Sequence, residues 1–127
     1  MSGLLNDSNF RIMQKSLDAL WLRQKVISNN IANIDTPGYK SKRVEFENIL
    51  NNQLTSLNND QGTNNQLQSI EPQIIEDNKY IMREDGNNVD IDAQNIELVR
   101  TQIQYEYMTR MISNAISREK YAITEGR

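Results

Sequence analysis

The residues that most invite a chemical role form an acidic and amide-rich string at 85–92. Asp85, Asn87, Asp90 and Asp92 carry oxygen atoms of the kind that bind calcium. Their spacing is not that of an EF-hand loop, and no glutamate stands at the loop's twelfth position. A turn followed by the N-cap of a helix is the better interpretation, with Asp90 or Asp92 as the cap.

Other chemistry-bearing groups are few. The chain has no Cys and no His, which excludes zinc fingers, disulfides, thiol nucleophiles and histidine-based triads. The adjacent carboxylates of Glu84 and Asp85 are not surrounded by the apolar residues of a pocket. The basic cluster of Lys40, Lys42 and Arg43 is bracketed by glutamates, as in a solvated segment. We therefore expect neither an enzyme nor a metal or cofactor site, and the net charge of -3 argues against nucleic-acid binding.

The composition indicates a thin hydrophobic core. Asn and Gln make up 27 of the 127 residues, and the chain has one Trp and two Phe. The length suits a single domain over 1–127. Apolar runs are too short for a membrane span or for the core of a signal peptide, so we expect no membrane insertion and no cleaved signal.

Two long terminal helices are the elements that must position these residues. One is predicted over about 6–34, where Gly and Pro are absent. Its seam alternates spacings of three and four residues, the heptad pattern of helices that pack along a narrow stripe. The apolar seam residues are Phe10, Met13, Leu17, Leu20, Ile27, Ile31 and Ile34. Trp21, Leu22 and Val26 widen the stripe and indicate contact with more than one neighbour.

The second helix is predicted over about 92–124, with a weaker and more mixed seam. Its seam residues are Leu98, Thr101, Tyr105, Met108, Ile112, Ala115, Glu119 and Ala122, and the flanking residues that broaden the apolar face are Ile96, Ile103, Ile116 and Ile123. We expect the two helices to pair in a coiled-coil-like manner, which gives a mainly α fold. We also expect their apolar seams to serve as assembly interfaces with other copies or other chains.

The segment between the helices, 35–91, is predicted to be an irregular insertion. Thr36-Pro37-Gly38-Tyr39 has Pro and Gly at the two central positions of a type II turn, which must end the first helix. A short helix of about three turns is predicted through 46–57, and the amide-rich tract at 58–65 is predicted to be a flexible loop.

Two short apolar runs follow in the second half of the insertion. Ile74-Ile75 and Tyr80-Ile81-Met82 flank Asp77-Asn78, a pattern that allows one small β-hairpin. Asp85-Gly86-Asn87-Asn88 is predicted to form a second turn before the last helix.

One long string of residues resembles a known family. The string from Gln24 to Lys40 resembles the N-terminal signature of bacterial flagellar rod and hook proteins. Its characteristic residues are Asn29, Asn30, Ala32, Asn33, Thr36, Pro37, Gly38 and Tyr39. Asn29, Asn30 and Asn33 have two interpretations: amides facing solvent at a fraying helix end, or side chains that cap the helix and bond neighbouring subunits.

Two further features resemble the proximal rod proteins of the B type within that family. One is Val44-Glu45-Phe46 after the turn. The other is the string made of Asp85, Gly86, Asn87, Asn88, Val89 and Asp90. The resemblance covers about 10–47 and 83–124, and Ala93-Gln94-Asn95 departs from the charged residues that the family usually has there.

The resemblance implies a structural subunit of the rod of the flagellar basal body, in the periplasmic space. It implies export by the flagellar type III apparatus, a role in transmitting torque, and no cofactor. The implied partners are other rod proteins, the ring and adaptor proteins of the basal body, and further copies of the chain. Two alternatives stay open: another small flagellar axial protein such as the second proximal rod type, and an unrelated cytosolic coiled-coil scaffold.

Overall fold

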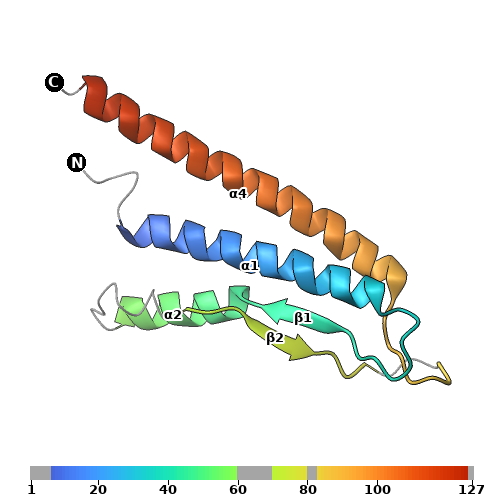
Figure 1. Ribbon diagram of the computed structural model, residues 1–127. Helices are drawn as coiled ribbons and strands as arrows, with labels where there is room; N and C mark the ends of the chain where they lie inside the picture. The colour runs from blue at the N-terminus through green and yellow to red at the C-terminus, as the bar shows by residue number, and fades with distance from the viewer. Residues whose placement is uncertain (1–6, 60–69, 80–82, 126–127) are drawn as a thin grey trace.

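The computed structural model describes residues 7–59, 70–79 and 83–125. The elements in chain order are α1 (Asp7–Ala32), β1 (Lys42–Glu45), α2 (Glu47–Asn59), β2 (Gln73–Glu76) and α4 (Ile91–Glu125). They form three tiers, with α4 above α1, and α2 and the two strands below it (Figure 1). The predicted fold class is confirmed, since the chain is mainly helical and its long terminal helices pair.

The boundaries of the long helices follow from local chemistry. After Ala32 the backbone tightens, and the Asn33 N–H is shared between the carbonyls of Asn29 and Asn30. At the start of α4, Oδ1 of Asp90 accepts hydrogen bonds from the backbone N–H groups of Asp92 at 3.1 Å and Ala93 at 3.3 Å. Asp90 is therefore the N-cap that the sequence left open between Asp90 and Asp92.

The two long helices run antiparallel, so that α1 begins and α4 ends at the same end of the molecule (Figure 1). Their register is marked by Asn30, whose Nδ2 donates to Oε1 of Gln94 at 3.0 Å. This register places Leu17 at about the height of Met108, and both belong to the predicted seams. In α4 the seam positions are the shielded ones, because Thr101 and Ala115 are buried and the other six are half-buried.

A second face of α1 packs on the lower tier. Ala19 forms a buried core with Phe46 and Ile70, and the partly buried residues packed against it are Ile12, Ile49, Leu50 and Leu54. Val26 is also buried, which confirms that α1 has more than one neighbour. Trp21 was expected to widen the same stripe, but its side chain is exposed. Helix α1 is thus the central layer of the fold.

The sheet of the insertion differs from the predicted local hairpin. β2 contains Ile74 and Ile75 as expected, but it pairs antiparallel with β1, and Val44 lies opposite Ile74. Residues 80–82, the predicted partner, lie outside the described residues. Short apolar runs cannot reveal a pairing partner 30 residues away, because turn signals report only on neighbouring segments. Of the predicted loop at 58–65, residues 58–59 belong to α2 and the rest lies outside the described residues.

Candidate assembly surfaces and the asparagine junction

The Thr36–Tyr39 segment forms the predicted turn. Gly38 has a φ of 74°, and the Tyr39 N–H donates to the carbonyl of Thr36 at 3.2 Å. Positive φ at the third residue is the requirement that made Gly38 a turn residue in the sequence. The Gly38 N–H also donates to the carbonyl of Asp85 at 2.7 Å. The turn therefore meets the second characteristic string of the sequence.

Asn30 is a fully buried polar side chain at the centre of this meeting point. Its Nδ2 donates to the carbonyl of Lys42 at 2.7 Å as well as to Gln94, and its Oδ1 accepts from the Lys42 N–H at 2.9 Å. The Tyr39 hydroxyl donates to the same Oδ1 at 3.2 Å. Burial raises the pKa of Tyr39, which keeps the phenol protonated and able to donate. One amide thus connects α1, the turn, β1 and α4.

Asn87, in the second characteristic string, is another buried amide that connects separate segments of the chain. It is fully buried, and its Nδ2 donates to the carbonyls of Asn33 at 2.8 Å and Thr36 at 2.9 Å. Its Oδ1 accepts from the Val89 N–H at 2.9 Å. Both carbonyls lie in the turns that follow α1 and also accept backbone N–H groups there, so the Asn87 side chain ties these turns to the second string.

Asn88 completes the network. Its Oδ1 accepts from the Ser41 N–H at 2.6 Å, and its Nδ2 donates to the carbonyls of Asp77 at 2.6 Å and Lys79 at 3.1 Å. We call the side chains of Asn30, Asn87 and Asn88 with their bonded groups the asparagine junction. It joins the two characteristic strings of the sequence into a single buried structure.

The remaining residues of the two strings lie around the junction. Asn33 caps the end of α1, since its Nδ2 donates to the Asn29 carbonyl and its Oδ1 accepts from Thr36. Asn29 and Ala32 are exposed. Of the two interpretations of these amides, exposure holds for Asn29 only, while Asn30 and Asn33 bond within the chain.

The second string also forms a turn, placed slightly earlier than predicted. The Gly86 N–H donates to the carbonyl of Arg83 at 3.1 Å, and Gly86 has a φ of 76°. Arg83 in turn donates to the carbonyl of Ile34 at 2.9 Å. Within the described ranges no group of three or more carboxylates is placed to hold a metal ion, and Asp90 acts as a helix cap.

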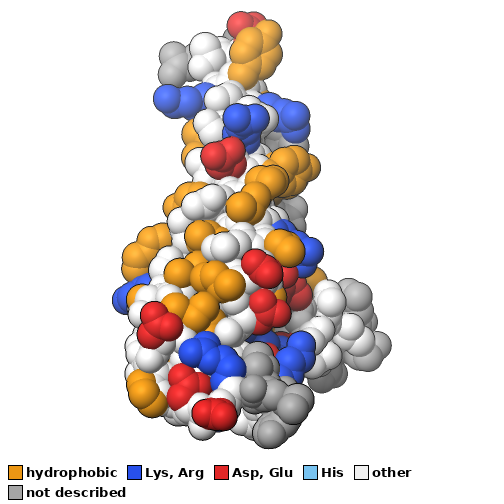
Figure 2. Space-filling model, turned by 90° about the vertical axis from the view of Figure 1, so that its right-hand side faces the viewer, with side chains coloured by type: hydrophobic (Ala, Val, Ile, Leu, Met, Phe, Trp, Pro, Cys, Tyr) orange, Lys and Arg blue, Asp and Glu red, His pale blue; other side chains and the backbone are white. Residues whose placement is uncertain are grey.

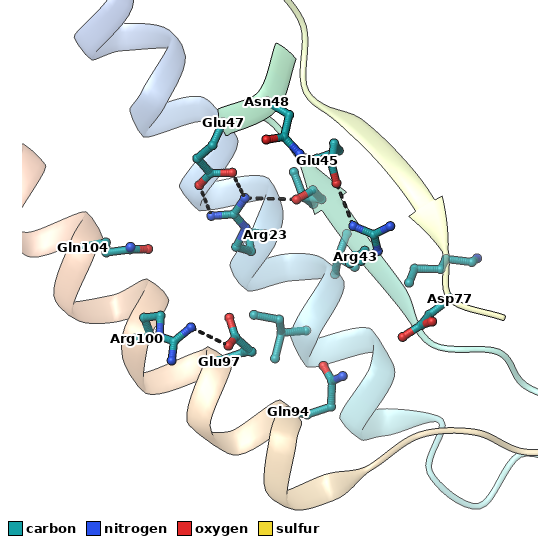
Figure 3. Close-up of a pocket in the computed structure, with 14 residues that line it drawn as sticks. Arg23, Arg43, Glu45, Glu47, Asn48, Asp77, Gln94, Glu97, Arg100 and Gln104 are labelled. Carbon is teal, nitrogen blue, oxygen red and sulfur yellow. Dashed lines mark hydrogen bonds and ion pairs between the residues drawn. The ribbon is translucent and has the colours of Figure 1, made fainter. Parts of the chain in front are cut away.

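A charged cleft of about 480 Å³ lies between α1, β1 and α4 (Figure 3). Arg23 of α1 donates to both carboxylate oxygens of Glu47 at 2.7 Å and to the carbonyl of Val44 at 3.0 Å. On the wall formed by α4, Arg100 is paired with Glu97 at 2.9 Å.

The Arg23–Glu47 pair dominates the electrostatics of this cleft. The hydrogen bond from Arg23 lowers the pKa of Glu47, and the same bond raises the pKa of Arg23. Each charge stabilises the other, and this arrangement binds the start of α2 to the middle of α1. No local pattern predicts the pair, because its members are 24 residues apart.

Exposed apolar side chains gather along the side of α4 that faces away from its buried Thr101. We call Ile96, Val99, Ile103 and Tyr107 the outer stripe, and each is more than half exposed. Their spacings of three and four residues place them along one side of the helix. Figure 2 shows apolar side chains along the upper part of the molecule, which α4 forms. Ile96 and Ile103 belong to the broadened face predicted from the sequence. Val99 and Tyr107 were not predicted, although their spacing from these residues was a usable signal.

The residues predicted as assembly interfaces lie mostly in the seam within the chain. Leu20 and Ile27 are buried, and Phe10 is 37% exposed. The half-buried members are Met13, Leu17, Ile31, Ile34, Leu98, Tyr105, Met108 and Ile112. These side chains are shielded by the chain's own helices, so the outer stripe offers more free apolar surface. Contact of the seam residues with other subunits stays a prediction.

Comparison with known proteins gives a consistent result. The family described as Flagella basal body rod protein matches residues 11–40, which include Asn30 and the turn. The chain is 38% identical over 110 residues to the flagellar basal body rod protein FlgB of Borreliella burgdorferi, with 75% of this chain and 80% of that protein covered. It is 31% identical over 122 residues to the protein of the same name from Bacillus subtilis, with 91% and 92% covered. Among the described residues, no helix is long and apolar enough to cross a membrane.

Proposed function

This chain belongs to the flagella basal body rod protein family and is of the FlgB type, and on that premise we propose that it is built into the basal-body rod as a structural subunit. The sequence strings predicted both the family and the type. The FlgB relatives are matched over most of their own length, so the similarity is not confined to the N-terminal string.

The outer stripe is the observation that carries this proposal. Its four large apolar side chains are exposed within the first half of a 35-residue helix. Contiguous exposed apolar surface is typical of protein–protein contact sites, and it gains most when a neighbour covers it. The subunit therefore suits side-by-side assembly with its own copies and with other rod proteins.

The tight internal bonding supports a mechanical role. The asparagine junction and the Arg23–Glu47 pair connect α1 to the strands, to α2 and to α4. A subunit that transmits torque must pass force between its surfaces without internal sliding, and satisfied buried polar networks supply that rigidity. We propose that the chain reaches the periplasmic rod by flagellar type III export without a cleaved signal. There it contacts other rod proteins and the ring or adaptor proteins, and it needs no cofactor.

A charge-insertion experiment tests the proposal. A strain lacking the gene is complemented with the wild-type chain, with Ile103→Asp in the outer stripe, or with the matched Gln102→Asp on the neighbouring exposed position. We expect Ile103→Asp to abolish swimming and to be missing from purified basal bodies, while Gln102→Asp restores both. If the strain lacking the gene swims normally with complete rods, the proposed function is wrong.

A further inference from the structure

An apolar groove of about 220 Å³ opens where α1, α2 and α4 meet. Ala19 and Leu20 of α1, Phe46 and Leu50 at the start of α2, and Met108 of α4 supply its apolar lining. Ala19, Leu20 and Phe46 are buried parts of the fold, so the groove is lined by fixed side chains. Tyr107 of the outer stripe stands at its edge, which makes the groove continuous with the exposed apolar surface of α4.

Trp21, the single tryptophan, is left out of the core. Its side chain is 58% exposed, and Nζ of Lys25 lies 5.6 Å from the ring centroid. Tryptophan is among the residue types that contribute most to protein–protein contacts, because it buries a large rigid apolar ring. An exposed indole in a chain that has so few aromatic residues therefore marks a contact point.

Trp21 and the groove lie on opposite sides of α1. At 3.6 residues per turn, Trp21 is rotated by about 140° from Ser16 and about 160° from Arg23, and both of these residues line the groove. The indole therefore cannot fill the groove of its own chain. A contact that uses two different surfaces of identical subunits is heterologous, and it can repeat along a filament.

The charges around the two surfaces are complementary. Asp18 and Lys25 flank Trp21 at one helical turn on either side. The groove is bordered by Arg23 and by Glu47, whose side chain is 61% exposed. Arg23 is 15% exposed and already bound to Glu47 and to the Val44 carbonyl, whereas the exposed carboxylate of Glu47 is open to a second cation. Lys25 of a second copy supplies that cation, together with the apolar insert.

We propose that Trp21 of one copy inserts into the groove of the next copy in the rod, with Lys25 facing Glu47 across the contact. The inference deepens the proposed function and rests on it, since it assigns the surfaces through which neighbouring copies join. It gives the outer stripe a neighbour at its Tyr107 end.

Site-specific photo-crosslinking tests the contact in the full chain. A photoreactive phenylalanine analogue replaces Trp21, and basal bodies purified after irradiation are analysed by mass spectrometry. We expect crosslinked dimers of this chain that join position 21 to peptides containing Leu50 or Met108. The same analogue at Tyr121, which is 69% exposed near the end of α4, serves as the matched control and should give no crosslink to the groove.

The outcomes separate this inference from the proposed function. If the chain is present in the basal bodies but position 21 crosslinks to another protein, to another surface or to nothing, the Trp21 contact is wrong and the rod function stands. If the wild-type chain is missing from basal bodies, the proposed function fails first.

Substitutions supply an independent readout. We expect Trp21→Ala to reduce the swimming halo to that of the strain lacking the gene, whereas Trp21→Phe retains part of it. Ser16→Phe fills the groove from the other side of the contact and should have the effect of Trp21→Ala. Thermal melts of the purified variants should match the wild type, because neither side chain is buried. Full swimming of Trp21→Ala would overturn the proposal.

Discussion

Asn30 shows how much of this fold depends on one amide. The side chain offers two donors and one acceptor oxygen, and all of them are used inside the chain. An aspartate at this position would lack the Nδ2 donor, and an alanine would leave the Lys42 backbone without its partner. The requirement for asparagine is therefore chemical.

We expect Asn30→Ala to lower the free energy of unfolding by about 2–3 kcal/mol, because buried backbone groups lose their hydrogen bonds. Urea denaturation of the purified chain measures the change. Asn29→Ala is the matched control, since Asn29 is exposed one residue earlier, and its effect should stay within about 0.5 kcal/mol. Equal effects of the two substitutions would contradict the central role of Asn30.

At the residue scale, the features that depend on neighbouring residues could be predicted from the sequence. Pro37 and Gly38 predicted the turn, because the required φ values restrict the residue types directly. Asp90 was one of two predicted caps for a similar reason. The burial of Asn30 could not be predicted, since its partners lie 9 to 64 residues away along the chain. An amide-rich string looks solvated until the fold brings backbone groups to it.

Helix α1 serves as a layer with two packing faces at the scale of the elements. Heptad spacing predicted the face that meets α4, because both helices carry the pattern. The face that meets Phe46 and Ile70 was only partly visible, in Val26. The partner of β2 was missed because strand pairing over this distance depends on how the lower tier packs on α1.

Ile70 anchors the lower tier to α1, and its removal should show how much that packing contributes. We expect Ile70→Ala to lower the free energy of unfolding by about 2–4 kcal/mol, because the side chain is 2% exposed and its loss leaves a cavity. Ile74→Ala, the same change at a position that is 52% exposed, should cost less than about 1 kcal/mol. Chemical denaturation of both variants makes the comparison.

The Arg23–Glu47 pair predicts a dependence of stability on pH. The folded-state pKa of Glu47 lies below its ordinary value of 4.5, so the carboxylate contributes stability above about pH 4.5. That contribution is lost as the pH falls through the lowered folded-state pKa. Because the Glu47 side chain is 61% exposed, solvent screens the pair and its coupling should be below about 1 kcal/mol.

A double-mutant cycle with Arg23→Gln and Glu47→Gln measures this coupling. We expect a favourable value at about pH 7 and a smaller one at about pH 3. A coupling that grew on acidification would show that the pair does not stabilise the fold through the ionised carboxylate.

At the scale of the whole molecule, the apolar residues fall into two groups: those buried in the fold and those exposed on its surface. The seam and the lower core are covered within the chain, and the outer stripe and Trp21 are exposed. The sequence predicted two long apolar helices and therefore the fold class. The sequence could not show which of these apolar residues are covered within the chain and which are exposed, because periodicity does not identify the partner that lies opposite a helix face.

The same substitution at two isoleucines tests this division. Ile27 is 5% exposed in the seam, so we expect Ile27→Asp to unfold much of the monomer, because a buried charge has no partner there. Ile103 is 62% exposed, and Ile103→Asp should retain the wild-type circular dichroism spectrum and melting temperature. If Ile103→Asp also unfolds the monomer, the outer stripe is part of the core.

The asparagine junction also requires residues from distant parts of the chain to be present together. Asn30 donates a hydrogen bond to Gln94, 64 residues further along the chain. The carbonyls of Asn33 and Thr36 accept hydrogen bonds from Asn87. A chain that folds as it is synthesised cannot close the junction until Gln94 has emerged, when nearly three quarters of its 127 residues have been made. Shorter N-terminal fragments therefore lack the bond that joins α1 to α4 at this point.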